Sequence, residues 1–273
     1  MRGSAIDRRA RPVAPLGRDA AVGGPFAAPK NARLLLTVGS ALPDATKAEL
    51  ERVLPAGGTV YILGSTQAVP ASVEAQLKAL GYVTVRYGGV DRYATAVAVA
   101  DALGDPSTVL LATGINFPDA LAAASAAAKA GGVVLLTNGT SLPSATSAYL
   151  RAHPGTVYAV GGPAVAADPG AVALAGIDRF ATAVAVATRF FPAPTAVGIA
   201  TGYNFPDALA GSALLASVGV PLLLAATTSL PGSTADYLAS VKATATTAHL
   251  FGDPKALSAQ VETAVDAALG ITP

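Results

Sequence analysis

Two aspartates at matching places in a long internal repeat, Asp119 and Asp207, are the acids best placed to do chemistry. Each lies in the stretch Asn-Phe-Pro-Asp-Ala-Leu-Ala, which begins at Asn116 and returns at Asn204. Two carboxylates facing one bond could cleave a glycoside, but acids at one position of two copies would each need a partner. Capping of the following helix explains both acids and both asparagines, and a cap contributes about 1 kcal/mol. The sequence therefore favours a structural role for these residues over catalysis.

Two arginines stand in a second repeated stretch, Asp-Arg-aromatic-Ala-Thr-Ala. Arg92 follows Asp91 and Arg179 follows Asp178, and each aspartate suits the N-cap of a helix. A cation in the first turn is disfavoured by the helix dipole by roughly 0.3–1 kcal/mol. Each arginine therefore needs a compensating partner, either a carboxylate of the neighbouring repeat or an anionic ligand. The sequence favours the carboxylate and leaves the ligand open.

The residue types do not indicate cysteine or histidine catalysis, a metal site or a nucleotide cofactor. The chain has no cysteine, and His153 and His249 are neither repeat mates nor spaced with a second ligand. These facts exclude thiolate catalysis and predict neither a metal site nor a catalytic triad. The strand-to-helix turns carry bulky residues where a nucleotide fingerprint requires glycine. We therefore expect no catalytic residue, no metal and no cofactor.

The composition is that of a folded protein with a basic start. Of 273 residues, 52% are apolar and 13% charged, and the net charge of +1 predicts no nucleic-acid binding. Residues 1–33 hold seven Lys and Arg against two Asp and Glu, and they contain no stretch of signal-peptide type. The uncharged segment 208–226 contains Gly219 and Pro221, which predicts helix, turn and strand rather than membrane insertion.

The elements that must position these residues alternate between strand and helix. In the second copy we predict strands over 108–114, 133–137 and 156–160, with helices over 118–130 and from 143 to about 152. Short apolar strands joined by helices predict parallel pairing with right-handed crossovers. The fold class is therefore α/β, built of tandem Rossmann-like or flavodoxin-like three-layer repeats with parallel sheets.

The copies define the expected domains. Thr46, Thr146 and Thr234 share one repeat position, so three copies are present. Only 12 residues separate Asp7 from Asp19, against 28 between Asp91 and Asp119, which leaves no room for a first helix and strand. We predict a basic, disordered leader (1–18), a truncated repeat 1 (19–90), repeat 2 (91–177) and repeat 3 (178–273).

The junction between the second and third copies is also short. From Gly64 to Asp91 there are 27 residues, but from Gly161 to Asp178 only 17. The second copy is therefore expected to have lost most of its fourth strand.

These stretches, with the Leu-Leu-Thr strand and Val-Tyr-x-x-Gly-Gly, resemble the bacterial cell wall binding repeat of the second type from about residue 19 to residue 268. Such repeats occur in threes on secreted Gram-positive proteins, including S-layer-associated proteins and amidase modifiers. The resemblance implies three Rossmann-like modules around a pseudo-threefold axis. It also implies an extracellular location at the cell wall, and a catalytic or adhesive region elsewhere in many members.

The function implied is noncovalent anchoring to an anionic secondary wall polymer of the teichoic-acid kind. In this family a Pro-Ile-Leu-Leu strand is tied to polymer binding, and here only the third copy keeps its proline, as Pro221, Leu222 and Leu223. With the repeated polar residues they form the expected polymer-binding set: Arg92, Arg179, Asn116, Asn204, Pro221, Leu222 and Leu223. The alternative is a cell wall hydrolase or sugar-phosphate enzyme on a Rossmann-like sheet, for which no converging polar residues are found.

Overall fold

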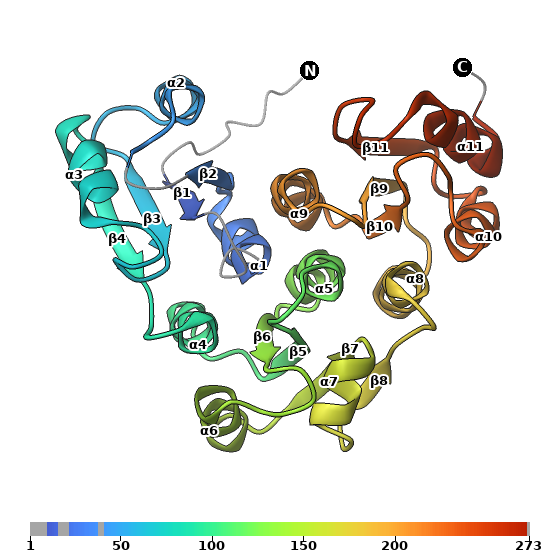
Figure 1. Cartoon of the computed structure of the whole chain (residues 1–273), viewed down its shortest axis with the longest axis horizontal. Coiled ribbons are helices and arrows are strands. Elements are labelled where there is room, and N and C mark those ends of the chain that lie inside the picture. Colours follow the sequence, from blue (N-terminus) through green and yellow to red (C-terminus); the bar gives the residue numbers. More distant parts are fainter. Residues whose placement is uncertain (1–9, 16–21, 38–40, 272–273) are drawn as a thin grey trace, which may run out of the picture.

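The chain folds into three parallel sheets arranged around three central helices (Figure 1). The computed structural model describes residues 10–15, 22–37 and 41–271. Among these residues no helix is long and apolar enough to span a membrane. The predicted α/β class with parallel sheets is confirmed.

The three sheets share one strand order, in which the first strand of the copy lies between the second and the third. The first sheet is β2-β1-β3-β4, from β1 (Ala10–Pro15), β2 (Leu35–Thr37), β3 (Thr59–Leu63) and β4 (Val83–Tyr87). The second is β6-β5-β7-β8, from β5 (Thr108–Thr113), β6 (Val133–Thr137), β7 (Thr156–Val160) and β8 (Val172–Leu174). The third is β10-β9-β11, from β9 (Ala196–Thr201), β10 (Leu222–Ala225) and β11 (Thr247–Phe251).

Helices connect the strands and cover both faces of the sheets. They are α1 (Gly23–Ala27), the short 3₁₀ helix η2 (Ala28–Lys30), α2 (Asp44–Val53), α3 (Ala71–Ala79), α4 (Arg92–Ala102), α5 (Pro118–Lys129), α6 (Ser144–Ala152), α7 (Gly162–Ala167), α8 (Arg179–Phe190), α9 (Pro206–Val218), α10 (Gly232–Val241) and α11 (Ala259–Leu269). Coverage on both faces explains why the strands are continuous apolar runs.

One threonine position fixes a helix to a strand in all three copies. The hydroxyls of Thr46, Thr146 and Thr234 donate to the carbonyl oxygens of Leu36, Leu136 and Leu224, at 2.7, 2.8 and 2.9 Å. The bond joins the helix after the second strand to that strand. The register read from the sequence is thus reproduced as one repeated contact.

The start of repeat 1 differs from expectation. Residues 10–15, which the sequence placed in a disordered leader, form β1 at the centre of the first sheet. β1 pairs in parallel with both β2 and β3, which do not pair with each other. A central strand is required because the backbone groups of its neighbours need partners. The expectation that repeat 1 lacks this strand is therefore wrong.

The fourth strand of repeat 2 is shorter than its counterpart, but the prediction that most of it is lost is wrong. β8 has three residues, whereas its counterpart β4 has five.

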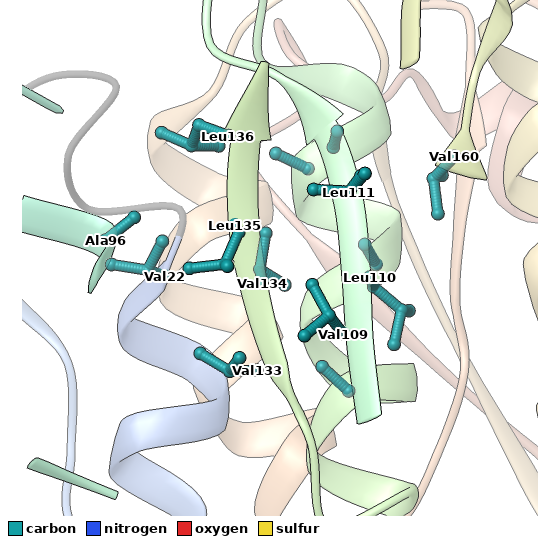
Figure 2. Close-up of a cluster of buried hydrophobic side chains, with 14 of the residues drawn as sticks. Val22, Ala96, Val109, Leu110, Leu111, Val133, Val134, Leu135, Leu136 and Val160 are labelled. Carbon is teal, nitrogen blue, oxygen red and sulfur yellow. The ribbon is translucent and has the colours of Figure 1, made fainter. Parts of the chain in front are cut away.

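The core of repeat 2 lies where β5 and β6 meet the helices. Every residue of β6 is buried. Figure 2 shows the side chains of β5 and β6 extending to Val22, just before α1, and to Ala96 of α4. This core therefore joins repeat 2 to repeat 1 rather than closing within one copy.

The three repeats meet where α1, α5 and α9 cross at the centre of the molecule (Figure 1). One repeat position, held by Gly24, Ala124 and Ser212, supplies a small residue to each helix. A Cβ atom added to Gly24 would lie 3.0 Å from the Ala124 Cβ and 3.4 Å from the Ser212 Oγ. Small side chains thus permit the close approach of the helices on which the pseudo-threefold arrangement depends.

Candidate functional site

Each of the second and third sheets has a crevice at the carboxyl ends of its first and third strands. The chain leaves these two strands in opposite directions, and ligands of open α/β sheets bind at such a switch point. In repeat 2 it lies between the turn after β5, with Asn116, and Gly161 after β7. In repeat 3 it lies between the turn after β9, with Asn204, and Gly252 after β11.

The crevice of repeat 2 lies between two repeats. Its cavity of about 250 Å³ is lined by Asn116, Pro118, Asp119, Gly162, Gly176, Ile177, Asp178, Arg179 and Thr182. The residues up to Ile177 belong to repeat 2, and Asp178, Arg179 and Thr182, at the start of α8, belong to repeat 3. A ligand here would contact both repeats at once.

Asp119 is the acid at the floor of this crevice. Its side chain lies against Gly161, which has a φ of 84°, and a Cβ there would overlap the carboxylate. Burial raises the pKa of Asp119 to about 6, while the positive charge of Arg179 acts in the opposite direction. Protonation of this carboxyl group therefore changes within the range of pH found in biological fluids.

Both repeated arginines donate to the strand end of their own repeat. Arg92 Nη1 donates to the Gly114 carbonyl oxygen and Arg179 Nη1 to the Gly202 carbonyl oxygen, both at 2.6 Å. The Arg179 guanidinium also lies 5.6 Å from the ring centre of Tyr203. A backbone carbonyl is thus the direct partner that offsets the cation in the first turn.

For Arg179, a carboxylate of the neighbouring repeat is close enough to interact electrostatically, without an ion pair between the two side chains among the described residues. Asp119 belongs to repeat 2, and the charge of Arg179 lowers its pKa. The counterpart for Arg92 is Asp19, which lies outside the described residues.

The predicted capping roles divide into two groups. Asp91 and Asp178 are N-caps, each accepting at 2.8 Å from the backbone N–H of Ala94 or Ala181. This prediction is confirmed.

The second prediction is wrong: helices α5 and α9 are not capped by Asn116, Asn204, Asp119 or Asp207. α5 and α9 begin at proline after a phenylalanine N-cap that makes no side-chain capping bond. The two asparagines instead accept from the N–H of the next residue, at 2.9 and 3.0 Å. A capping asparagine would stand directly before the first helical residue, but here the phenylalanine takes that place. The asparagine therefore stays in the turn before the helix, with its side chain at the crevice.

The crevice of repeat 3 is larger and carries different side chains. Its cavity of about 430 Å³ is lined by Thr201, Tyr203, Asn204, Asp207, Thr227, Asp253, Lys255 and Ala256. Tyr203 is 58% exposed, whereas its repeat mate is Ile115. Asp253 accepts from the backbone N–H groups of Lys255 and Ala256 at 2.9 and 3.1 Å.

The sequence analysis missed the polar residues unique to this crevice, namely Tyr203, Asp253 and Lys255. A position-by-position alignment of the copies would have found the first two, because Ile115 and Gly162 stand in their places in repeat 2. The same alignment sets Lys255 against Ala164, but only the turn after β11 shows that Lys255 reaches the crevice.

Three residues expected to bind polymer lie inside the protein. Pro221 precedes β10 and is buried, and Leu222 and Leu223 in β10 are 1% and 0% exposed. Their side chains pack against the helices on the two faces of the third sheet. Because they are buried, these three residues do not form part of an exposed binding surface.

The geometry gives no support to paired-carboxylate hydrolysis. Asp119 and Asp207 line separate crevices, so they cannot act on one glycosidic bond. Among the described residues no three His, Cys, Asp or Glu side chains gather where they could hold a metal ion.

Comparison with known proteins connects this architecture to the bacterial cell wall. The chain is 32% identical over 213 residues to N-acetylmuramoyl-L-alanine amidase LytC of Bacillus subtilis (strain 168), a match that spans 76% of this chain and 42% of the amidase. It is 33% identical over 119 residues to the amidase enhancer of the same organism, spanning 44% of this chain and 16% of that protein.

Solved structures share the fold over nearly the whole chain. Cwp6 from Clostridium difficile superposes with a TM-score of 0.85 at 25% identity, covering 96% of this chain and 44% of Cwp6. Cwp8 from the same organism gives 0.81 at 25% identity, covering 98% of this chain and 48% of Cwp8. The chain thus spans less than half the length of each of these relatives.

A family model described as Cell wall binding domain 2 (CWB2) matches residues 6–74, 86–169 and 173–262, one segment for each repeat. With three matched segments and three sheets of common topology, the chain belongs to the Cell wall binding domain 2 (CWB2) family.

Proposed function

We propose that this chain anchors a protein noncovalently to the cell wall by binding an anionic secondary wall polymer, of the teichoic-acid kind, in its switch-point crevices. The observation that carries the proposal is the placement of Arg179. Its guanidinium lies at the boundary of two repeats, beside an open cavity and a half-exposed tyrosine ring. A polymer passing from one crevice to the next would meet this cation.

The side chains suit a polymer that carries both hydroxyl and anionic groups. Asn116 and Asn204 each have an amide N–H₂ that can donate to a ligand, since their carbonyl oxygens already accept from the backbone. Asp119 and Asp207 can accept from sugar hydroxyls, and Tyr203 offers an exposed ring on which an apolar sugar face can rest. Arginine supplies charge-assisted hydrogen bonds to phosphate or carboxylate groups.

Binding at several crevices favours anchoring over a single tight site. Each crevice is small and open, so one contact alone is weak. Linked sites on a rigid scaffold raise the overall affinity of a repeating polymer by roughly 10²–10⁴. The polar residues unique to repeat 3 lead us to expect unequal sites, with the strongest in repeat 3.

The location and the wider protein follow from the same proposal. An anchor of this kind acts outside the cell, at the wall surface. Two relatives are an amidase and an amidase enhancer, so we propose that the anchored partner region is a wall-modifying or adhesive one.

The test is cosedimentation of the purified chain with Gram-positive cell walls, before and after acid extraction of their anionic polymers. We expect binding to untreated walls and at least a tenfold loss after extraction. Equal binding to both preparations would overturn the anionic ligand, and binding to neither would overturn the anchoring role.

A pair of variants identifies the crevices. Arg92→Ala with Arg179→Ala should weaken wall binding at least tenfold, while the matched control Arg151→Ala, an exposed arginine on α6, should bind as the unchanged chain does. Far-ultraviolet circular dichroism must show that the double variant is folded. If it unfolds, or binds walls normally when folded, the arginines are struts between repeats and not ligand contacts.

A further inference from the structure

Within the described residues, one face of the central helix α9 lacks the cover that its two counterparts have. The register that aligns Leu42, Leu142 and Leu230 also aligns Phe26 of α1, Ala126 of α5 and Leu214 of α9. Phe26 and Ala126 are fully buried, but Leu214 is 46% exposed. One turn earlier, Val22 and Ala122 are buried while their counterpart Ala210 is exposed.

Helices α4 and α8 contribute to the cover of the first two counterparts. Ala96 and Val99 of α4 belong to the same core cluster as Val22 and Phe26, and Figure 2 shows Ala96 beside Val22. The Phe26 ring also packs against Tyr61 and Tyr87 of the first sheet. Each of these helices thus bridges the central helix of one repeat to the second strand of the next.

At the next boundary α8 repeats this arrangement. Its residues Phe180 and Ala183 pack with Ala122 of α5 and Leu224 of β10. In Figure 1, α8 lies between α5 and α10, beside β10.

The third boundary, between α9 and β2, holds a groove where such a helix would lie. The groove has a volume of about 310 Å³ and is lined on the α9 side by Ala210, Ala213, Leu214 and Ser217, and on the β2 side by Arg33, Leu34 and Leu35, with Asn31, Ala32 and Glu49 at its margin. Val218, 56% exposed, extends the apolar stripe by one turn.

The strand beside the groove shows a similar lack of cover at Leu36, which is not itself among the residues that line the groove. Leu36 is only half-buried, whereas its counterparts Leu136 and Leu224 are 0% and 1% exposed. An incomplete boundary therefore leaves apolar side chains from two different repeats open to solvent.

In the sequence, repeat 1 leaves little room for a helix of this kind just before β1. In repeat 2, all of α4 lies between Asp91 and the start of β5 at Thr108. The matching acid of repeat 1 is Asp7, and β1 begins at Ala10, only three residues later. No helix of that length fits between them.

We propose that the groove between α9 and β2 binds an amphipathic, alanine-rich helix of the α4 and α8 kind, supplied by another polypeptide. The partner helix would have about three turns, because α4 has 11 residues and α8 has 12. It would present an aromatic residue and alanines to Leu214 and Leu36, as α8 presents Phe180 and Ala183 to Ala122 and Leu224. This interaction does not depend on polymer binding.

The direct test is a titration of the full chain into a fluorescein-labelled peptide with the sequence of residues 178–191, followed by fluorescence anisotropy. We expect saturable binding with one peptide for each chain. Leu214→Arg should weaken it at least tenfold. The control Val172→Arg, at a 48% exposed valine on β8, should leave it unchanged. A peptide with aspartate at the positions of Phe180 and Ala183 should not bind.

Sedimentation of the chain alone distinguishes other occupants. A dimer that Leu214→Arg dissociates, with no peptide bound, would overturn the proposal in favour of a second copy covering the face. A monomer that binds no peptide would overturn it in favour of a bare face.

A second experiment builds the missing helix into the chain itself. Inserting a copy of residues 92–107 between Arg9 and Ala10 should raise Tm by about 4 °C or more, and Leu214→Arg should then remove the gain. An unchanged Tm in a folded insertion variant would contradict the proposal.

Discussion

At the residue scale, the two repeated arginines show how a locally unfavourable charge is accommodated. Each lies in a first helical turn and donates to a carbonyl oxygen at the end of a strand. Gly114 and Gly202 provide these carbonyls. A Cβ at either would lie 2.9 Å from an atom of the Tyr93 or Phe180 ring. The glycine in Thr-Gly-x-Asn-Phe-Pro therefore makes room for the helix that carries the arginine.

Asp119 gives a prediction about pH. Its pKa is about 6 in the folded chain against 3.8 as reference, so the folded state holds a proton that the unfolded state has released between these values. Stability contributed by this group is therefore present at pH 4 and lost as the pH rises through 6. We expect Asp119→Asn to show a smaller fall in urea midpoint between pH 4.5 and pH 7 than the unchanged chain. Parallel profiles would contradict the assignment.

The same ionisation bears on the proposed ligand. Facing Asp119 are Arg179, whose charge favours an anion, and Asp178, whose charge opposes one. Above pH 6 ionised Asp119 adds to the opposition, so wall binding should strengthen from pH 7.5 to pH 5. Asp119→Asn should remove most of this dependence in the cosedimentation assay. A dependence that persists in the variant would arise elsewhere.

Glu74 shows the opposite behaviour in repeat 1. Its carboxylate accepts from Arg86 at 2.8 and 3.1 Å and lies 2.8 Å from Lys78 Nζ, and hydrogen bonds to these two cations lower its pKa to about 2. This contribution to stability is present above about pH 4.5 and is lost as the pH falls toward 2.

Arg86→Ala should therefore destabilise the chain. Arg86 also donates to the carbonyl oxygens of Gly64 and Val69, at 2.8 and 2.9 Å. Loss of these bonds in a half-buried place should cost about 1–3 kcal/mol in urea unfolding at pH 7. The control Arg151→Ala should cost less than about 0.5 kcal/mol.

At the scale of elements, apolar runs and the prolines and glycines at their ends predicted most helices and strands of repeat 2 correctly. The predicted helix over 118–130 is α5, and the strands over 133–137 and 156–160 are β6 and β7. These elements have strong local signals, with proline at the start, glycines after the end and continuous apolar runs between. β1 was missed because its residues 10–15 include two prolines and an arginine, and its pairing with β2 and β3 comes from residues distant in the sequence.

The N-caps give a prediction at this scale. Asp178→Ala removes the side-chain bond to the Ala181 N–H at the start of α8. Because α8 bridges two repeats, fraying of its first turn should cost about 1 kcal/mol in thermal unfolding and also displace Arg179. Asp178→Asn, which keeps a capping oxygen, should retain nearly full stability. If both variants lose the same amount of stability, the negative charge of Asp178, and not its capping hydrogen bond, stabilises the helix.

At the scale of the whole molecule, the central helices α1, α5 and α9 pack against one another, one from each repeat. Gly24 meets Ala124 and Ser212 there, and the cores of neighbouring repeats join through α4 and α8. The repeats are therefore expected to unfold together.

Gly24→Leu tests this cooperation. The added side chain would force α1 away from α5 and α9, which should cost at least about 1–3 kcal/mol and split the calorimetric transition. Gly232→Leu is the matched control, because a Cβ at Gly232 meets no other atom within 4 Å. A single transition of unchanged midpoint in Gly24→Leu would show that the central contact does not couple the repeats.

The sequence by itself determined the α/β class, the three copies, most element positions in repeat 2, the helix caps Asp91 and Asp178, and the family. Each follows from signals within one copy or from comparison of copies. Only the tertiary structure decided that Pro221, Leu222 and Leu223 are interior, that Asp119 is half-buried beside Gly161, and that Leu214 is uncovered. Burial and pKa depend on which surfaces of different repeats meet, and a repeat period carries no information about those contacts.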